Sequence, residues 1–96
     1  MYIPAPMANP RKPVEIERVQ TGVKLEKRLL KVLKGVAEYH DMTLGDLLEG
    51  IVLHAFEGKA PFGRDTLARI AQLRSVYGLD LRAADSHRLV EKPGRG

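Results

Sequence analysis

The stretch RVQTGVKLEKRLLKVLKGVAEYHDMTLGDLLEGIVLHAF, from Arg18 to Phe56, decides the fold because the period of its apolar residues changes near Glu26. Before that point, apolar and polar residues alternate, which is typical of a half-buried strand. We therefore expect a strand over roughly residues 18–25. One side of this strand carries Val19, Thr21, Val23 and Leu25, and the other carries Arg18, Gln20, Gly22 and Lys24.

From Glu26 onward the apolar residues recur at steps of three and four, with lysines and arginines between them, which predicts an amphipathic helix ending near His40. After a short connection, Thr43 and Asp46 have the spacing of a capping box, so a second helix is expected from Leu44. The apolar stripe of this second helix is too wide for one neighbouring helix to cover. A second subunit is the expected cover.

The flanks differ from this central part. Residues 1–13 contain four of the six prolines, so we expect a flexible arm there, followed by a folded domain over residues 14–58. Gly58 and Pro61 then supply helix-stop signals. Residues 59–96 are predicted to form a helical extension with a frayed end. It holds a third helix from Asp65 or Thr66 to about Tyr77, and a further helical stretch over residues 79–91.

Composition limits how such a chain can be stabilised. Ninety-six residues give a small core, and domains of this size commonly recruit a disulfide, a metal or a partner subunit. The chain has no cysteine, and its three histidines, His40, His54 and His87, lack the close pairing of structural zinc sites. No membrane span or signal peptide is indicated, so a cytoplasmic protein is expected. Oligomerisation is the remaining route to stability.

Charge is distributed unevenly along the chain. The net charge is +4, with eight basic and four acidic residues in residues 1–40, four acidic and no basic residues in 41–57, and eight basic and four acidic residues in 58–96. A basic chain of this kind favours an acidic partner such as nucleic acid.

A single strand also needs a partner for its backbone groups, and the chain offers no second strand. Two copies would satisfy this need by pairing their strands.

The order of strand, helix, short turn and helix within about forty residues resembles the ribbon-helix-helix (Arc/MetJ/CopG-like) superfamily of bacterial and phage regulators. The resemblance covers roughly Arg18 to Phe56, and its sharpest points are the V-x-x-x-V-x-L pattern of Val19 to Leu25 and the segment VAEYHDMTLGDLLEGIV. It implies a mostly α homodimer with an intermolecular antiparallel β-ribbon. The implied dimer core consists of Val19, Val23, Leu25, Leu29, Leu33, Val36, Leu48, Ile51, Val52 and Phe56.

The resemblance also implies double-stranded DNA as the partner and transcriptional regulation, most often repression, as the function. The ribbon would enter the major groove and read bases with Gln20, Gly22 and Lys24, although Gly22 departs from the polar residue usual at that position. The start of the second helix would bind phosphate through Thr43, Leu44 and Gly45, with Thr43 equally suited to a simple N-cap role. Further attraction to phosphate is expected from Arg18, Lys27 and Arg28.

Other functions stay open from the sequence. Residues 59–96 are suited to binding a protein partner, as in antitoxins or scaffold proteins, and the sparse base-reading set also fits a nonspecific DNA-coating protein. No nucleophile elbow, phosphate loop or metal signature occurs, so we expect neither an enzyme nor a cofactor. The expected location is the cytoplasm, at the nucleoid of a bacterial or archaeal cell.

Overall fold

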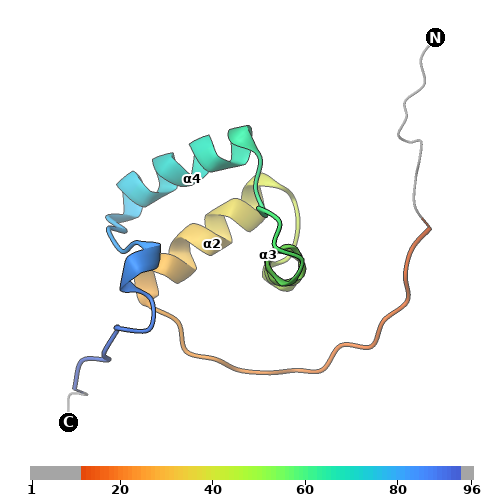
Figure 1. Ribbon diagram of the computed structural model, residues 1–96, viewed down its shortest axis with the longest axis horizontal. Helices are drawn as coiled ribbons and strands as arrows, with labels where there is room; N and C mark the ends of the chain where they lie inside the picture. The colour runs from red at the N-terminus through yellow and green to blue at the C-terminus, as the bar shows by residue number, and fades with distance from the viewer. Residues whose placement is uncertain (1–11, 94–96) are drawn as a thin grey trace.

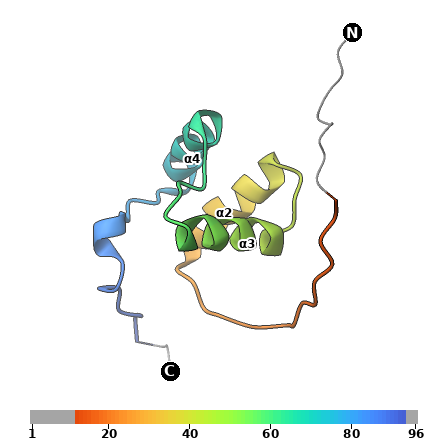
Figure 2. The same cartoon turned by 45° about the vertical axis from the view of Figure 1, so that its right-hand side comes forward.

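The computed structural model describes residues 12–93, and this part of the chain folds into three α-helices and one short 3-10 helix. Helices α2 (Lys27–Tyr39) and α4 (Arg64–Tyr77) lie side by side, and α3 (Leu44–Phe56) crosses near the end of α2 (Figures 1 and 2). The 3-10 helix η1 (Ala83–Asp85) follows α4 in the chain. No helix in residues 12–93 is long and apolar enough to cross a membrane.

The expected strand over residues 18–25 is wrong. Residues 12–93 contain no strand, so the described chain is all-helical and lacks the β-ribbon of a ribbon-helix-helix fold. Residues 12–25, which we call the leading segment, instead form an exposed loop, with Val19 84% and Val23 73% exposed. Alternation specifies which side chains share a face, whereas a strand also requires a hydrogen-bonded neighbour. Among the residues that the structure describes, no backbone hydrogen bond joins this segment to another, and Figure 1 draws it as a single loop.

The first two predicted helices are confirmed, and so is the predicted Thr43 cap of the second. The Glu26 carboxylate accepts a hydrogen bond from the Leu29 amide at 2.8 Å and so caps α2. The Thr43 hydroxyl accepts from the Asp46 amide at 3.1 Å and caps α3. These side chains satisfy backbone donors that the first turn of a helix leaves without partners.

The predicted third helix is confirmed as α4, which begins at Arg64 and ends where Gly78 adopts a left-handed conformation with φ 66°. Gly58 also has positive φ, at 71°, as its predicted cap position requires. The further helical stretch expected over residues 79–91 is reduced to η1. Much of that stretch consists of exposed residues, so it has little apolar surface to bury as a helix.

The core forms where α2 packs against both of the other helices. Val36, 1% exposed, lies at its centre, and Val32 is 5% exposed. Val32 lies one helical turn before Val36 on α2, which packs against both α3 and α4. Partly buried side chains complete this core. The fully buried apolar residues are Val32, Val36, Ala37, Leu47 and Leu79, and the partly buried ones are Leu33, Ile51, Phe62, Ile70, Leu73 and Leu81.

Helices α2 and α4 contact each other along their length. Leu73 of α4 lies against Gly35 of α2, where any larger residue would crowd its methyl groups. Toward one end, the Lys31 ammonium lies 5.7 Å from the centre of the Tyr77 ring. Toward the other, the Arg69 guanidinium lies 4.7 Å from the centre of the Tyr39 ring. Cations over aromatic faces are attracted by the ring electrons, so these contacts help to hold the two helices together.

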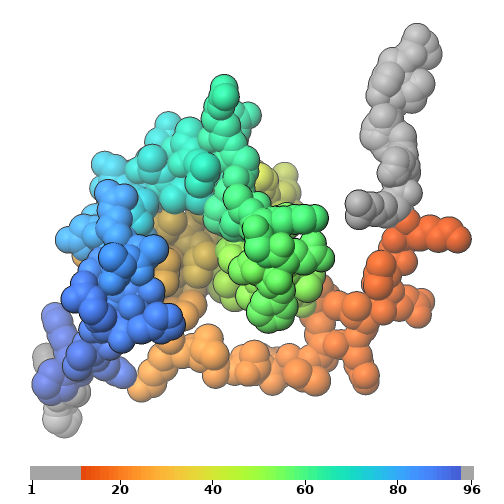
Figure 3. Space-filling model, in the orientation of Figure 1, coloured from red at the N-terminus to blue at the C-terminus, as the bar shows by residue number. Residues whose placement is uncertain are grey.

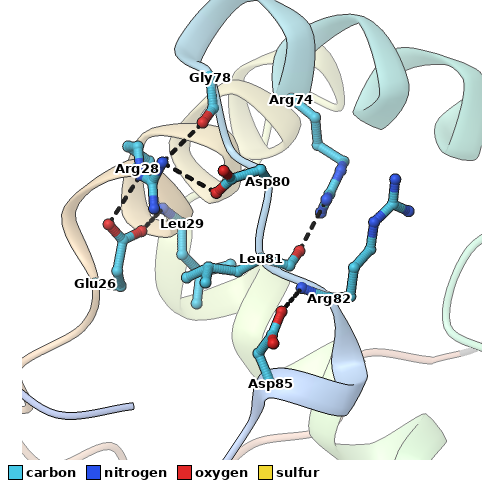
Figure 4. A network of polar contacts seen from close by, with 9 residues as sticks. All are labelled: Glu26, Arg28, Leu29, Arg74, Gly78, Asp80, Leu81, Arg82 and Asp85. Atoms are coloured by element: carbon cyan, nitrogen blue, oxygen red, sulfur yellow. Dashed lines mark hydrogen bonds and ion pairs between the residues drawn. The ribbon is translucent and has the colours of Figure 1, made fainter. Parts of the chain in front are cut away.

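The chain after α4 is attached to the start of α2 through residues 79–82, which we call the C-terminal strap (Figure 4). Arg28 donates to the Gly78 carbonyl at 2.9 Å and to the Asp80 carboxylate at 3.2 Å. Arg74 donates to the Leu81 carbonyl at 2.8 Å. With Leu79 buried beneath, the strap is part of the folded unit.

Candidate nucleic-acid interface

The three residues predicted to read bases, Gln20, Gly22 and Lys24, are all exposed on the leading segment. A side chain at Gly22 would meet no atom within 4 Å, so space does not dictate glycine there. The Lys24 ammonium lies 3.5 Å from the Glu91 carboxylate, with both side chains more than three-quarters exposed. Exposed pairs of this kind are weak, so Lys24 can exchange Glu91 for another anion.

Arg18 forms hydrogen bonds with other residues of the same chain. Its guanidinium forms two 2.8 Å hydrogen bonds with Glu49 and one of 3.0 Å with Asp46, both on α3. The hydrogen bond from Arg18 lowers the pKa of Glu49, and the same bond raises the pKa of Arg18. The predicted phosphate contact of Arg18 would require breaking this pair. Arg18 instead attaches the leading segment to α3 and offsets part of the negative charge of Asp46 and Glu49.

Arg28 also has internal partners, because it bridges Glu26 to the C-terminal strap. Lys27 differs. Within residues 12–93, no carboxylate lies within 4.0 Å of the ammonium groups of Lys27, Lys31 or Lys34. These three lysines are exposed and follow one another at helical spacing on α2. Lys31 and Lys34 are not among the predicted phosphate contacts, although their spacing from Lys27 would have placed them on its face.

The amino end of α3 has the geometry expected of a capped helix. The Thr43 hydroxyl is engaged with the Asp46 amide, which establishes its N-cap role. Only half of the predicted capping box forms, because the Asp46 carboxylate accepts from Arg18. At Gly45 a side chain would meet only the Thr43 hydroxyl, at 3.9 Å, so this end of the helix is sterically open. Leu44 is half-buried beside it.

The residues predicted to form a dimer core differ in how far they are exposed. Val36 is buried within the single chain, while Leu33, Leu48 and Ile51 are half-buried. The other six leave substantial apolar surface uncovered, and we call them the apolar face. They are Val19, Val23, Leu25, Leu29, Val52 and Phe56, with exposed fractions of 84%, 73%, 40%, 36%, 43% and 81%.

Two histidines line a shallow, mostly apolar cavity of about 340 Å³ between α3 and the start of α4. His40 is hydrogen-bonded to the buried Thr66 hydroxyl at 2.9 Å, and His54 bonds to the Gly50 carbonyl at 2.7 Å. The first bond joins the end of α2 to the first turn of α4, and the second lies within α3. Within residues 12–93, no group of three or more histidine or acidic side chains is arranged to hold a metal ion.

No family model matches this chain, and neither a curated protein nor a solved structure matches it.

Proposed function

We propose that this chain is a sequence-specific DNA-binding regulator of transcription that acts as a homodimer. The observation that carries the proposal is the exposure of Gln20 and Lys24 on the leading segment, which leads into a helix, α2, whose Lys27, Lys31 and Lys34 form no ion pair within residues 12–93. Glutamine and lysine can donate to base edges in the major groove, and exposed lysines attract phosphate. In a bacterial or archaeal cell, the chain would act at the nucleoid.

The homodimer is supported by the apolar face. Covering exposed apolar side chains in an interface is favourable, and Phe56 of this set is 81% exposed. The core of the single chain contains only five fully buried apolar residues, so burial between two copies would add to stability. A two-fold dimer would also present two copies of each DNA contact.

Phosphate binding is supported by the row Lys27, Lys31 and Lys34 and by the open start of α3. Amides in the first turn of a helix favour an anion. The nearby carboxylates of Asp46 and Glu49 would repel phosphate, and the single positive charge of Arg18 offsets one of these two negative charges. In this proposal Arg18 therefore assists binding indirectly.

A salt titration with duplex fragments from the source genome tests the proposal. The double variant Gln20→Ala, Lys24→Ala is compared with wild type and with the matched control Gln72→Ala, Lys59→Ala, which removes the same exposed groups elsewhere. The expected result is selective binding that only the first double variant loses. Lys24→Ala alone should weaken specific binding by about 1–3 kcal/mol if this lysine reads a base. Full binding by the Gln20, Lys24 variant would contradict the proposal.

Lys31→Ala, Lys34→Ala tests the phosphate contacts separately. Affinity should fall equally for specific and random duplexes. The negative slope of log K against log salt should become less steep by about 0.9 for each lost phosphate contact. The ratio of specific to random affinity also tests the DNA-coating alternative. A ratio below about ten would favour coating, since regulators typically exceed ~10³.

A second candidate function, binding of a partner protein through residues 59–96, is favoured by one observation. Leu67 and Val76 of α4 remain 54% and 72% exposed. The same helix packs on α2, which argues against a tail that folds only when it binds. Hydrogen exchange on the isolated full-length chain distinguishes a folded α4 from a tail that folds only on binding. Slow exchange in α4 without a partner would exclude an antitoxin-like tail of the second kind.

A further inference from the structure

A shallow groove of about 400 Å³ lies between α4 and the C-terminal strap. Its apolar lining comes from Leu67 and Ile70 of α4 and from Leu79 of the strap. Two arginines, Arg74 and Arg82, also line it, and Figure 4 shows their side chains next to each other. The groove is open rather than enclosed, which suits an extended peptide.

The charge of this groove is unbalanced. Within residues 12–93, the Arg82 guanidinium has no carboxylate within 4.0 Å. The single hydrogen bond of Arg74 goes to a carbonyl, which leaves its positive charge uncompensated. Asp80 is the only acidic residue of the lining, and it is paired with Arg28. An occupant of this groove should therefore combine apolar side chains with negative charge.

The chain itself contains a segment of this kind at Val14–Glu17, with the sequence VEIE. Val14 and Ile16 are 81% and 60% exposed. Within the described residues, Glu15 and Glu17 have no basic side chain within 4.0 Å. Figure 3 shows the leading segment standing clear of the helical body over much of its length. None of these four residues takes part in the proposed DNA contacts.

We propose that Val14–Glu17 of one copy of the chain docks in the groove of a second copy. Alternate side chains of an extended peptide point in opposite directions, so Val14 and Ile16 can contact the apolar lining while Glu15 and Glu17 face the arginines. The lengths also match. Four extended residues span about 13 Å at ~3.3 Å each, and the seven steps from Leu67 to Arg74 span about 10 Å of helix at 1.5 Å each.

The segment and the groove of one copy are too far apart to meet each other. Arg18 fixes the end of the segment to α3. Both ribbon views show residues 12–17 on the side of the molecule opposite the strap (Figures 1 and 2). The contact is therefore between copies and uses a different surface on each. Such head-to-tail contacts can repeat and form open chains, in contrast to a closed two-fold dimer.

A charge exchange tests the electrostatic part of this contact. Sedimentation velocity of the full chain, without DNA, is measured for wild type, Glu15→Lys with Glu17→Lys, Arg82→Glu, and all three changes together. Each charge reversal alone should weaken association beyond the smallest species at least tenfold, and the combination should recover part of the loss, since Arg74 stays positive. Lys34→Glu is the control, since it changes net charge by the same amount as Arg82→Glu but lies outside the groove. A combined variant as weak as the single reversals would overturn the proposal.

A spin label locates the contact directly. The chain has no cysteine, so Ile16→Cys accepts a single nitroxide, and this labelled chain is mixed with ¹⁵N-labelled wild type. The expected result is broadening of amide signals of Leu67, Ala71 and Arg82 on the unlabelled partner. Broadening confined to α3, or none at α4, would contradict the proposed docking. Because neither measurement uses DNA, failure here and failure of the proposed DNA binding are distinguishable.

Discussion

A Cβ atom on Gly35 would lie 2.9 Å from both terminal methyl carbons of Leu73, so α2 and α4 are as close at this point as two helices with these residues allow. Contacts of that length are shorter than van der Waals packing permits. Glycine at position 35 thus sets the separation of the two helices. Its cost in helix propensity is offset by the packing that the close approach makes possible.

A comparison of two helical glycines tests this role. Gly50 lies in α3, where an added Cβ would meet no atom within 4 Å, so Gly50→Ala should stabilise the chain by about 0.5–1 kcal/mol through helix propensity alone. Gly35→Ala should fall short of that gain because Leu73 must move, and Gly35→Leu should destabilise by about 1–3 kcal/mol through overpacking. Urea denaturation measures all three. If alanine changed the free energy of unfolding equally at positions 35 and 50, the close contact with Leu73 would not contribute to stability.

The Arg18 pair should restrict the leading segment. In Arg18→Ala, the two hydrogen bonds to Glu49 and the one to Asp46 are lost, so amides of residues 14–22 should gain fast motion. Heteronuclear NOE values report that motion. Lys24→Ala is the control, because its pair with Glu91 is longer and more exposed. Arg18→Lys should restore little, since lysine lacks the planar fork that binds a carboxylate through two bonds.

Acid should loosen the start of α2. The hydrogen bond from the Leu29 amide, more than the contacts of Arg28, holds the pKa of Glu26 below its ordinary value. A carboxyl whose pKa is lowered by folding contributes stability above its unfolded pKa, and that contribution is lost as pH falls through the folded pKa. Stability should therefore decline below about pH 4.5, the ordinary value. Glu26→Gln, measured by urea denaturation from pH 7 to pH 3, should show a smaller decline than wild type.

The exposed Phe56 provides the test of the homodimer. Phe56→Glu places a charge in the proposed two-fold interface, so the mass of the chain in solution should fall while its far-UV circular dichroism stays helical. Val76→Glu is the matched control, because Val76 is 72% exposed near the end of α4 and Phe56 is 81% exposed at the end of α3. Light scattering gives the mass of each variant. A wild-type chain that is already monomeric at high concentration would refute the homodimer.

The parts of the fold that depend on neighbouring residues could be predicted from the sequence. Thr43 caps a helix through an amide three residues away, and Gly78 ends one by adopting positive φ, so local spacing was sufficient for both. The predicted strand failed for the opposite reason. The alternation from Val19 to Leu25 carries no information about a pairing partner, and the described chain supplies none.

Contacts distant in sequence were also beyond prediction. Arg18 and Glu49 are separated by 31 positions, and no local pattern indicates that they pair. From the sequence alone, Arg18 is therefore expected to contact phosphate, as an exposed arginine on a basic segment would. The close contact of Leu73 with Gly35 is likewise distant in sequence, and no local pattern indicates it.

The bonds of Arg28 to Gly78 and Asp80 close a ring that spans 50 and 52 positions of the chain. During synthesis, α2 leaves the ribosome long before the strap that covers its first turn. Its apolar residues stay uncovered until α4 and the strap, about 50 positions later, have also emerged. A nascent chain stopped before residue 78 would therefore expose surfaces that promote aggregation.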